Sequence, residues 1–194
     1  IDPLDIRYNV IQWVHRSTRG WSYGSSVIDP RTGEIIKGHV SLGSLRVRQD
    51  FMIAIGLLEA PYKSKGNKEK IALDMALSRI KQLSAHEIGH TLGFSHNFLA
   101  SSNNNSSVMD YPHPIIKIMN NKIDIKNAYS SGIGEWDKVS VAYSYSEFDE
   151  LEDEKIELKK ILENAYKNNL RFISDTDSRP KGSSHPLAHL WDNG

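Results

Sequence analysis

The chain of 194 residues contains no cysteine, and it has no excess of charge of either sign. The missing cysteine excludes disulfide bonds, thiolate metal ligands and a cysteine nucleophile. The 24 basic and 24 acidic residues cancel to a formal net charge of zero, so nothing in the charge indicates a nucleic acid or an anionic membrane surface as a partner. No apolar run approaches the roughly twenty residues that cross a bilayer, and we expect no membrane span.

The length is enough for one sizeable hydrophobic core, so we expect one domain over residues 1–194. Two lobes, at approximately 1–93 and 94–194, are compatible with this length. The chain begins with Ile1-Asp2-Pro3, without an initiator methionine or a signal sequence, and it ends at Asn193-Gly194. These ends indicate a piece of a longer chain, and further domains of that chain are expected partners.

The most informative segment is His86-Glu87-Ile88-Gly89-His90-Thr91-Leu92-Gly93-Phe94-Ser95-His96. Residues four apart lie on the same side of a helix, so His86 and His90 can point at one metal ion. Glu87 is too close to His86 along the helix to complete the same metal face. It can instead meet a water molecule bound to the metal and act as its general base.

Gly93 follows His90 at the distance where a glycine in the left-handed conformation ends a helix. His96 can then reach the same metal from a loop. Three histidines leave the fourth tetrahedral position of Zn²⁺ open for water, whose pKa zinc lowers to about 7. Two alternatives remain open: a surface helix with unrelated histidines, and zinc held for structure alone.

A second segment, Ser107-Val108-Met109-Asp110-Tyr111, begins shortly after His96. The extended histidine motif followed by a methionine-containing turn resembles the metzincin clan of zinc endopeptidases. The resemblance implies that Met109 forms the Met-turn, a hydrophobic floor beneath the metal. Tyr111 matches a tyrosine that astacin-like and serralysin-like metzincins use to bind the metal or stabilise the tetrahedral intermediate. A core methionine and a tyrosine packed beside Pro112 are the alternatives.

The resemblance extends from about Ile6 to the C-terminus when two earlier glycine-rich segments, 20–35 and 38–43, are included. These segments resemble the catalytic region of large bacterial zinc-dependent metalloproteases of the Bacteroidetes type. The resemblance implies an α+β fold, with a twisted mixed β-sheet and a long active-site helix in an N-terminal lobe. A mainly helical or irregular C-terminal lobe would lie across a cleft. It also implies a periplasmic, cell-surface or extracellular location.

Local patterns predict the elements that carry these motifs. β-branched and aromatic residues predict a strand at 6–14, central in its sheet, and turn residues at 29–34 predict a hairpin whose first strand is 23–28. Apolar spacing predicts helices at 46–58, 68–92 and 135–148. An acidic run at 147–157 precedes another helical pattern, and there we favour a solvated helix start over a calcium site.

In metzincins an edge strand binds the peptide substrate as an additional strand, and the resemblance assigns this role to Tyr23, Gly24, Ser25, Ser26 and Val27. An ordinary edge strand is the alternative. His185 and His189 are also four residues apart, but Pro186 between them disfavours a helix and we expect no second metal site.

The sequence therefore predicts a zinc-dependent endopeptidase with peptide or protein substrates, in which Glu87 activates a metal-bound water. The alternative is a catalytically inactive, zinc-containing module that binds peptides or serves as a scaffold. Glu87 argues against that alternative because holding a metal does not require this carboxylate. Hydrolysis of a non-peptide amide at the same site is a third hypothesis.

Overall fold

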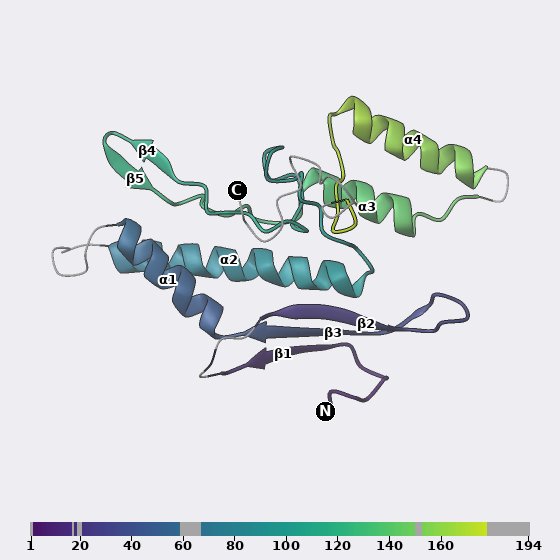
Figure 1. The fold of residues 1–194 in the computed structure, drawn as a ribbon, viewed down its shortest axis with the longest axis horizontal. Coiled ribbons are helices and arrows are strands. Elements are labelled where there is room, and N and C mark those ends of the chain that lie inside the picture. The colour runs from purple at the N-terminus through teal and green to yellow at the C-terminus, as the bar shows by residue number, and fades with distance from the viewer. Residues whose placement is uncertain (1, 17, 19–20, 59–66, 150–152, 178–194) are drawn as a thin grey trace. The chain divides into compact units, whose positions relative to one another are not determined.

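The computed structural model describes residues 2–16, 18, 21–58, 67–149 and 153–177 (Figure 1). These residues form an α+β fold with a mixed three-stranded sheet, a two-stranded hairpin and four helices, which confirms the predicted fold class. The chain divides into two compact units. Ile1–Gly93 and His113–Gly132 form the first unit, and Phe94–Pro112 and Ile133–Gly194 form the second.

The three-stranded sheet belongs to the first unit and has the order β1-β3-β2. Strand β1 (Val10–Val14) runs parallel to β3 (Ile35–Gly43), and β2 (Tyr23–Ile28) runs antiparallel to β3. The predicted hairpin is present. Gly33, in the left-handed conformation with φ of 78°, donates its N–H to Asp29 O at 2.8 Å and closes the turn between β2 and β3.

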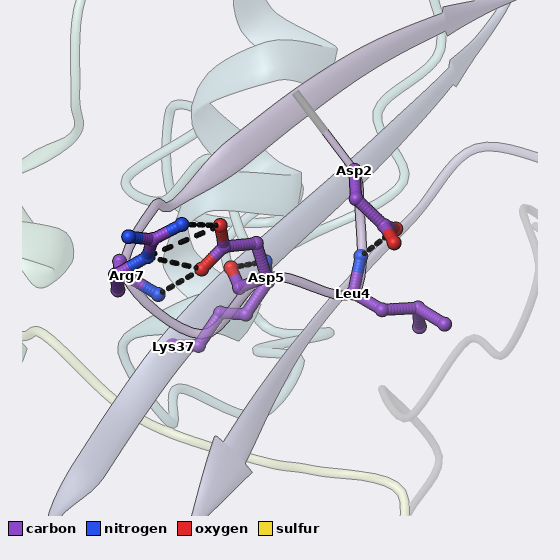
Figure 2. A network of polar contacts seen from close by, with 5 residues as sticks. All are labelled: Asp2, Leu4, Asp5, Arg7 and Lys37. Carbon is purple, nitrogen blue, oxygen red and sulfur yellow. Dashed lines mark hydrogen bonds and ion pairs between the residues drawn. The ribbon is translucent and has the colours of Figure 1, made fainter.

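The prediction that 6–14 forms a central strand was wrong in both length and position, because β1 begins at Val10 and lies at an edge. Before it, the chain folds on itself: the Arg7 guanidinium binds the Asp5 carboxylate at 2.6 Å, and Lys37 Nζ donates to Asp5 O at 2.6 Å (Figure 2). These local contacts replace strand pairing. At this edge, Trp13 is 42% exposed.

Helices α1 (Leu45–Leu57) and α2 (Lys68–Thr91) begin and end within one residue of their predicted bounds. Helix α2 lies against strands β2 and β3 (Figure 1). Its apolar stripe is buried as predicted: Leu83 packs with Val40 and Leu42 of β3, and Met75 packs with Ala54 of α1. This packing fixes the helix that continues into the histidine motif.

Residues His113–Gly132 belong to the first unit, whereas the expected lobe boundary placed all of 94–194 together. Ile125 and Tyr129 pack with Met75 of α2, which explains why this segment belongs to the first unit. The segment also contains a hairpin that the patterns did not predict, β4 (Lys117–Met119) and β5 (Lys122–Asp124). Its turn is Asn120-Asn121, and both asparagines adopt the left-handed conformation that this residue tolerates.

The second unit contains helices α3 (Glu135–Tyr145) and α4 (Glu154–Lys167), which contact each other. Helix α3 ends three residues before its predicted end, because Ser146 has an extended backbone. Asp153 caps α4 by accepting the N–H of Lys155. His185 and His189 lie outside the described residues. Among the residues that are described, no helix is long and apolar enough to cross a membrane.

Candidate metal centre

His86 and His90 lie one turn apart near the C-terminal end of α2, with their Nε2 atoms 3.1 Å apart. The two ring planes are nearly perpendicular, at 88°, and His86 is almost completely buried. Two imidazoles with facing nitrogens are stable at this distance if one ring donates to the other or if both lone pairs meet a cation. The spacing in the sequence therefore produces the predicted pair.

The third histidine follows the helix end. Gly93 has φ of 86°, the predicted left-handed conformation, and its N–H bonds His90 O at 3.0 Å. One ring nitrogen each of His86, His90 and His96 lies within 4.8 Å of the others. The prediction that these three residues form a group able to hold a metal is confirmed.

The donor set fits zinc. Neutral imidazole nitrogens bind Zn²⁺ at about 2.0–2.1 Å, and a tetrahedral arrangement separates two such nitrogens by about 3.3 Å. The 3.1 Å between the Nε2 atoms of His86 and His90 is close to that value. A ring nitrogen of His96 completes the group within the 4.8 Å limit given above. Three neutral imidazoles are a donor set that catalytic zinc sites use.

Glu87 is buried beside His86, with 4% of its surface exposed. Burial raises the pKa of its carboxyl to about 7, and the N–H of Gly24 and the positive charge of Arg79 oppose that rise. A carboxyl group that changes protonation near neutral pH is suited to accept and return a proton. This is the chemistry that the sequence predicts for Glu87.

Gly24 of β2 lies directly against Glu87. A Cβ on Gly24 would be 1.9 Å from the carbonyl oxygen of Glu87, so only glycine fits at this position. The other predicted substrate-binding residues alternate along the edge strand: Tyr23, Ser25 and Val27 are exposed, and Ser26 is half-buried like Gly24. Binding of a peptide by this strand stays a prediction.

His96 has a partner at each ring nitrogen. The hydroxyl of Tyr111 lies 2.7 Å from Nε2, and a carboxylate oxygen of Asp175 lies 2.8 Å from Nδ1. The sequence singled out Tyr111, and Tyr111 does contact a predicted metal ligand. The sequence did not single out Asp175, because Asp175 lies 79 residues from His96 and belongs to no recognisable motif.

Met109 is buried, with 3% of its surface exposed. Its carbonyl oxygen accepts the N–H of Asn97, the residue after His96, at 2.8 Å. Ser107 Oγ accepts the N–H of Met109 at 2.9 Å and donates to Asp137 at 2.5 Å, which ties the segment to α3. The backbone of Met109 is thus fixed beside the His96 loop. Its role as the floor of the metal site stays a prediction.

A family model described as Met-zincin matches residues 68–194, which is more than half of the chain and includes all of α2 and the three histidines. No curated protein and no solved structure matches the chain. The family match and the three converging imidazoles both indicate a metal-binding domain. The chain belongs to the Met-zincin family.

Proposed function

We propose that the protein is a zinc-dependent endopeptidase in which His86, His90 and His96 bind the metal and Glu87 is the general base. The observation that carries this proposal is the convergence of three histidine nitrogens beside the buried carboxyl group of Glu87. A site that only held zinc for structure would gain nothing from Glu87, because burial of a carboxyl group costs free energy. Membership of the Met-zincin family supports the same reaction class.

The metal would polarise the substrate carbonyl and lower the pKa of water. The chain supplies the proton transfers. Glu87 accepts a proton from the attacking water as the new carbon–oxygen bond forms. It then returns that proton to the leaving amine as the carbon–nitrogen bond breaks. The N–H of Gly24 holds the Glu87 carboxylate while this happens.

Strand β2 is the proposed substrate-binding edge. A peptide that pairs with it as an added strand would be held through main-chain hydrogen bonds, which accept many side-chain sequences. Tyr23 and Val27 are 46% and 50% exposed, so their side chains are available for contact with substrate side chains. Tyr111 is proposed to donate a hydrogen bond from its hydroxyl group to the developing oxyanion, in keeping with its position at Nε2 of His96.

The test is digestion of a denatured protein by zinc-loaded protein, with zinc content measured on the same samples. Glu87→Gln retains an oxygen that accepts the Gly24 N–H but cannot act as a base. We expect it to keep its zinc and to lose activity by about a thousandfold. Glu69→Gln, an exposed change in the first turn of α2, is the control and should cleave like the parent protein.

Two outcomes would contradict the proposal. If the zinc-loaded parent protein cleaves neither a denatured protein nor a peptide library, the chain is a binding or scaffold module. If Glu87→Gln cleaves as fast as the parent protein, Glu87 is not the base and the reaction follows another route.

A further inference from the structure

The loop that carries His96 is fixed by residues 171–174. Phe98 donates its N–H to Ile173 O at 2.9 Å, and the Asn97 side chain donates to Arg171 O at 2.9 Å. The Asn97 side-chain oxygen in turn accepts the N–H of Ile173 at 3.3 Å. Asn97 is completely buried, so these bonds are shielded from competition with water. A segment far along the chain thus holds the residues next to His96.

The same segment is anchored on its other side. The ring of Phe172 stacks on Trp136 of α3, with centroids 5.6 Å apart and planes 16° apart. The next residues form a tight turn in which Ser174 N–H donates to the Asp177 carboxylate and Asp177 N–H donates to Ser174 O, each at 3.0 Å. Asp175 lies inside this turn and therefore has a defined position.

A carboxylate oxygen of Asp175 lies 2.8 Å from Nδ1 of His96. A carboxylate can only accept a hydrogen bond, so Nδ1 must carry the proton. In the neutral ring this leaves the lone pair on Nε2. The Tyr111 hydroxyl at Nε2 can either donate or accept, so Tyr111 does not decide the tautomer. Asp175 decides it.

We propose that Asp175 is a positioning residue of the metal site: it fixes the tautomer and the orientation of His96 so that Nε2 faces the metal. The inference rests on the proposed zinc site, but the tautomer itself is defined without metal. Partners that orient a metal-binding histidine contribute about ten- to a hundredfold to metal affinity. Asp175 is half exposed, with 52% of its side chain accessible, so we expect the lower end of that range.

The experiment compares Asp175→Ala, Asp175→Asn and the control Asp177→Asn in the full chain. Asp175→Ala removes the acceptor, and Asp175→Asn keeps a neutral oxygen that can still accept from Nδ1. Asp177→Asn removes the same charge from the same turn and keeps an acceptor for Ser174 N–H. The first readout is the zinc dissociation constant, measured by competition with a chelator. The second is the ¹⁵N spectrum of His96 in zinc-free protein.

We expect Asp175→Ala to raise the zinc dissociation constant about tenfold, Asp175→Asn to raise it less, and Asp177→Asn to leave it within about twofold. In the ¹⁵N spectrum, the parent protein should show His96 protonated at Nδ1, and Asp175→Ala should lose this preference. Unchanged zinc affinity in Asp175→Ala, or a His96 protonated at Nε2 in the parent protein, would overturn the proposal. If the parent protein binds no zinc, the proposed function fails while the ¹⁵N spectrum still tests Asp175.

Discussion

Gly24 on strand β2 approaches Glu87 on helix α2 so closely that a Cβ at Gly24 would lie 1.9 Å from the Glu87 carbonyl oxygen and 2.7 Å from its carbonyl carbon. Both are backbone atoms, so they cannot move away without displacing the helix that carries His86 and His90. The absence of a side chain at Gly24 therefore sets the distance between the edge strand and the proposed base.

Gly24→Ala should consequently destabilise the protein by about 3 kcal/mol, because overpacking against backbone cannot be relieved by a rotamer change. Gly43→Ala is the matched control, since Gly43 is also in the sheet and an added Cβ there would meet no atom within 4 Å. We expect the control to change stability by less than about 0.5 kcal/mol. Urea unfolding of zinc-free protein measures both, and equal stability of the two variants would contradict the packing described.

The sequence was sufficient to predict helix α2 and its histidines because the information is local. The apolar stripe that includes Met75 and Leu83 repeats with the period of a helix. Gly93 marks the end of that helix, because glycine readily adopts the left-handed conformation found there. The same local signals predicted the turn around Gly33.

The features that the sequence did not predict depend on contacts between distant residues. The residue pattern of Val10–Val14 predicts a strand but does not indicate whether that strand lies at the centre or the edge of its sheet. The β4–β5 hairpin has a recognisable turn signal in Asn120-Asn121, but its three-residue strands are too short to show alternation. Asp175 meets His96 only because residues 171–174 bind the His96 loop.

Asn97→Ala should destabilise the protein by about 2–4 kcal/mol, because it leaves buried and partly buried backbone groups without partners. The Asn97 side chain bonds three of them, on Leu99, Arg171 and Ile173. Asn103→Ala is the control, since the Asn103 side chain makes an exposed bond to Asn169 O, and the change should cost about 0.5 kcal/mol. Urea unfolding of the two variants tests this, and a similar small loss in both would show that Asn97 does not hold the 171–174 segment.

The burial of Asp50 predicts that the stability of the protein depends on pH. It is completely buried in α1, and burial raises the pKa of its carboxyl above 3.8 despite the nearby charges of Arg46 and Arg79. The folded state then keeps a proton that the unfolded state has released, so the stability contributed by this group falls as pH rises from 3.8 to the raised pKa. Above and below that window the contribution is constant.

Asp50→Asn removes this titration and keeps the shape of the side chain. The free energy of unfolding of the parent protein minus that of Asp50→Asn should decrease as pH rises through the window, which urea unfolding at a series of pH values can measure. A difference that increases with pH would mean that the ion pair with Arg46 lowers the pKa, contrary to the burial argument.

Tyr111→Phe tests the proposed oxyanion donor. Loss of one such donor reduces kcat by about a hundredfold, whereas zinc content should be unchanged. Tyr143→Phe on α3 is the control, because Tyr143 is 42% exposed and has no assigned role in the site. Steady-state kinetics on a peptide substrate measures the effect. An unchanged kcat in Tyr111→Phe would contradict the role of Tyr111 as oxyanion donor and leave only its contact with His96.

The central claim is that His86, His90 and His96 bind one zinc ion. X-ray absorption at the zinc edge, on protein loaded with one equivalent of zinc, tests it most directly. We predict one bound zinc per chain with three imidazole nitrogens at about 2.0–2.1 Å, and loss of one imidazole from the spectrum in His96→Ala but none in His113→Ala. A zinc ion with fewer than three imidazole ligands, or a spectrum that His96→Ala leaves unchanged, would contradict the account.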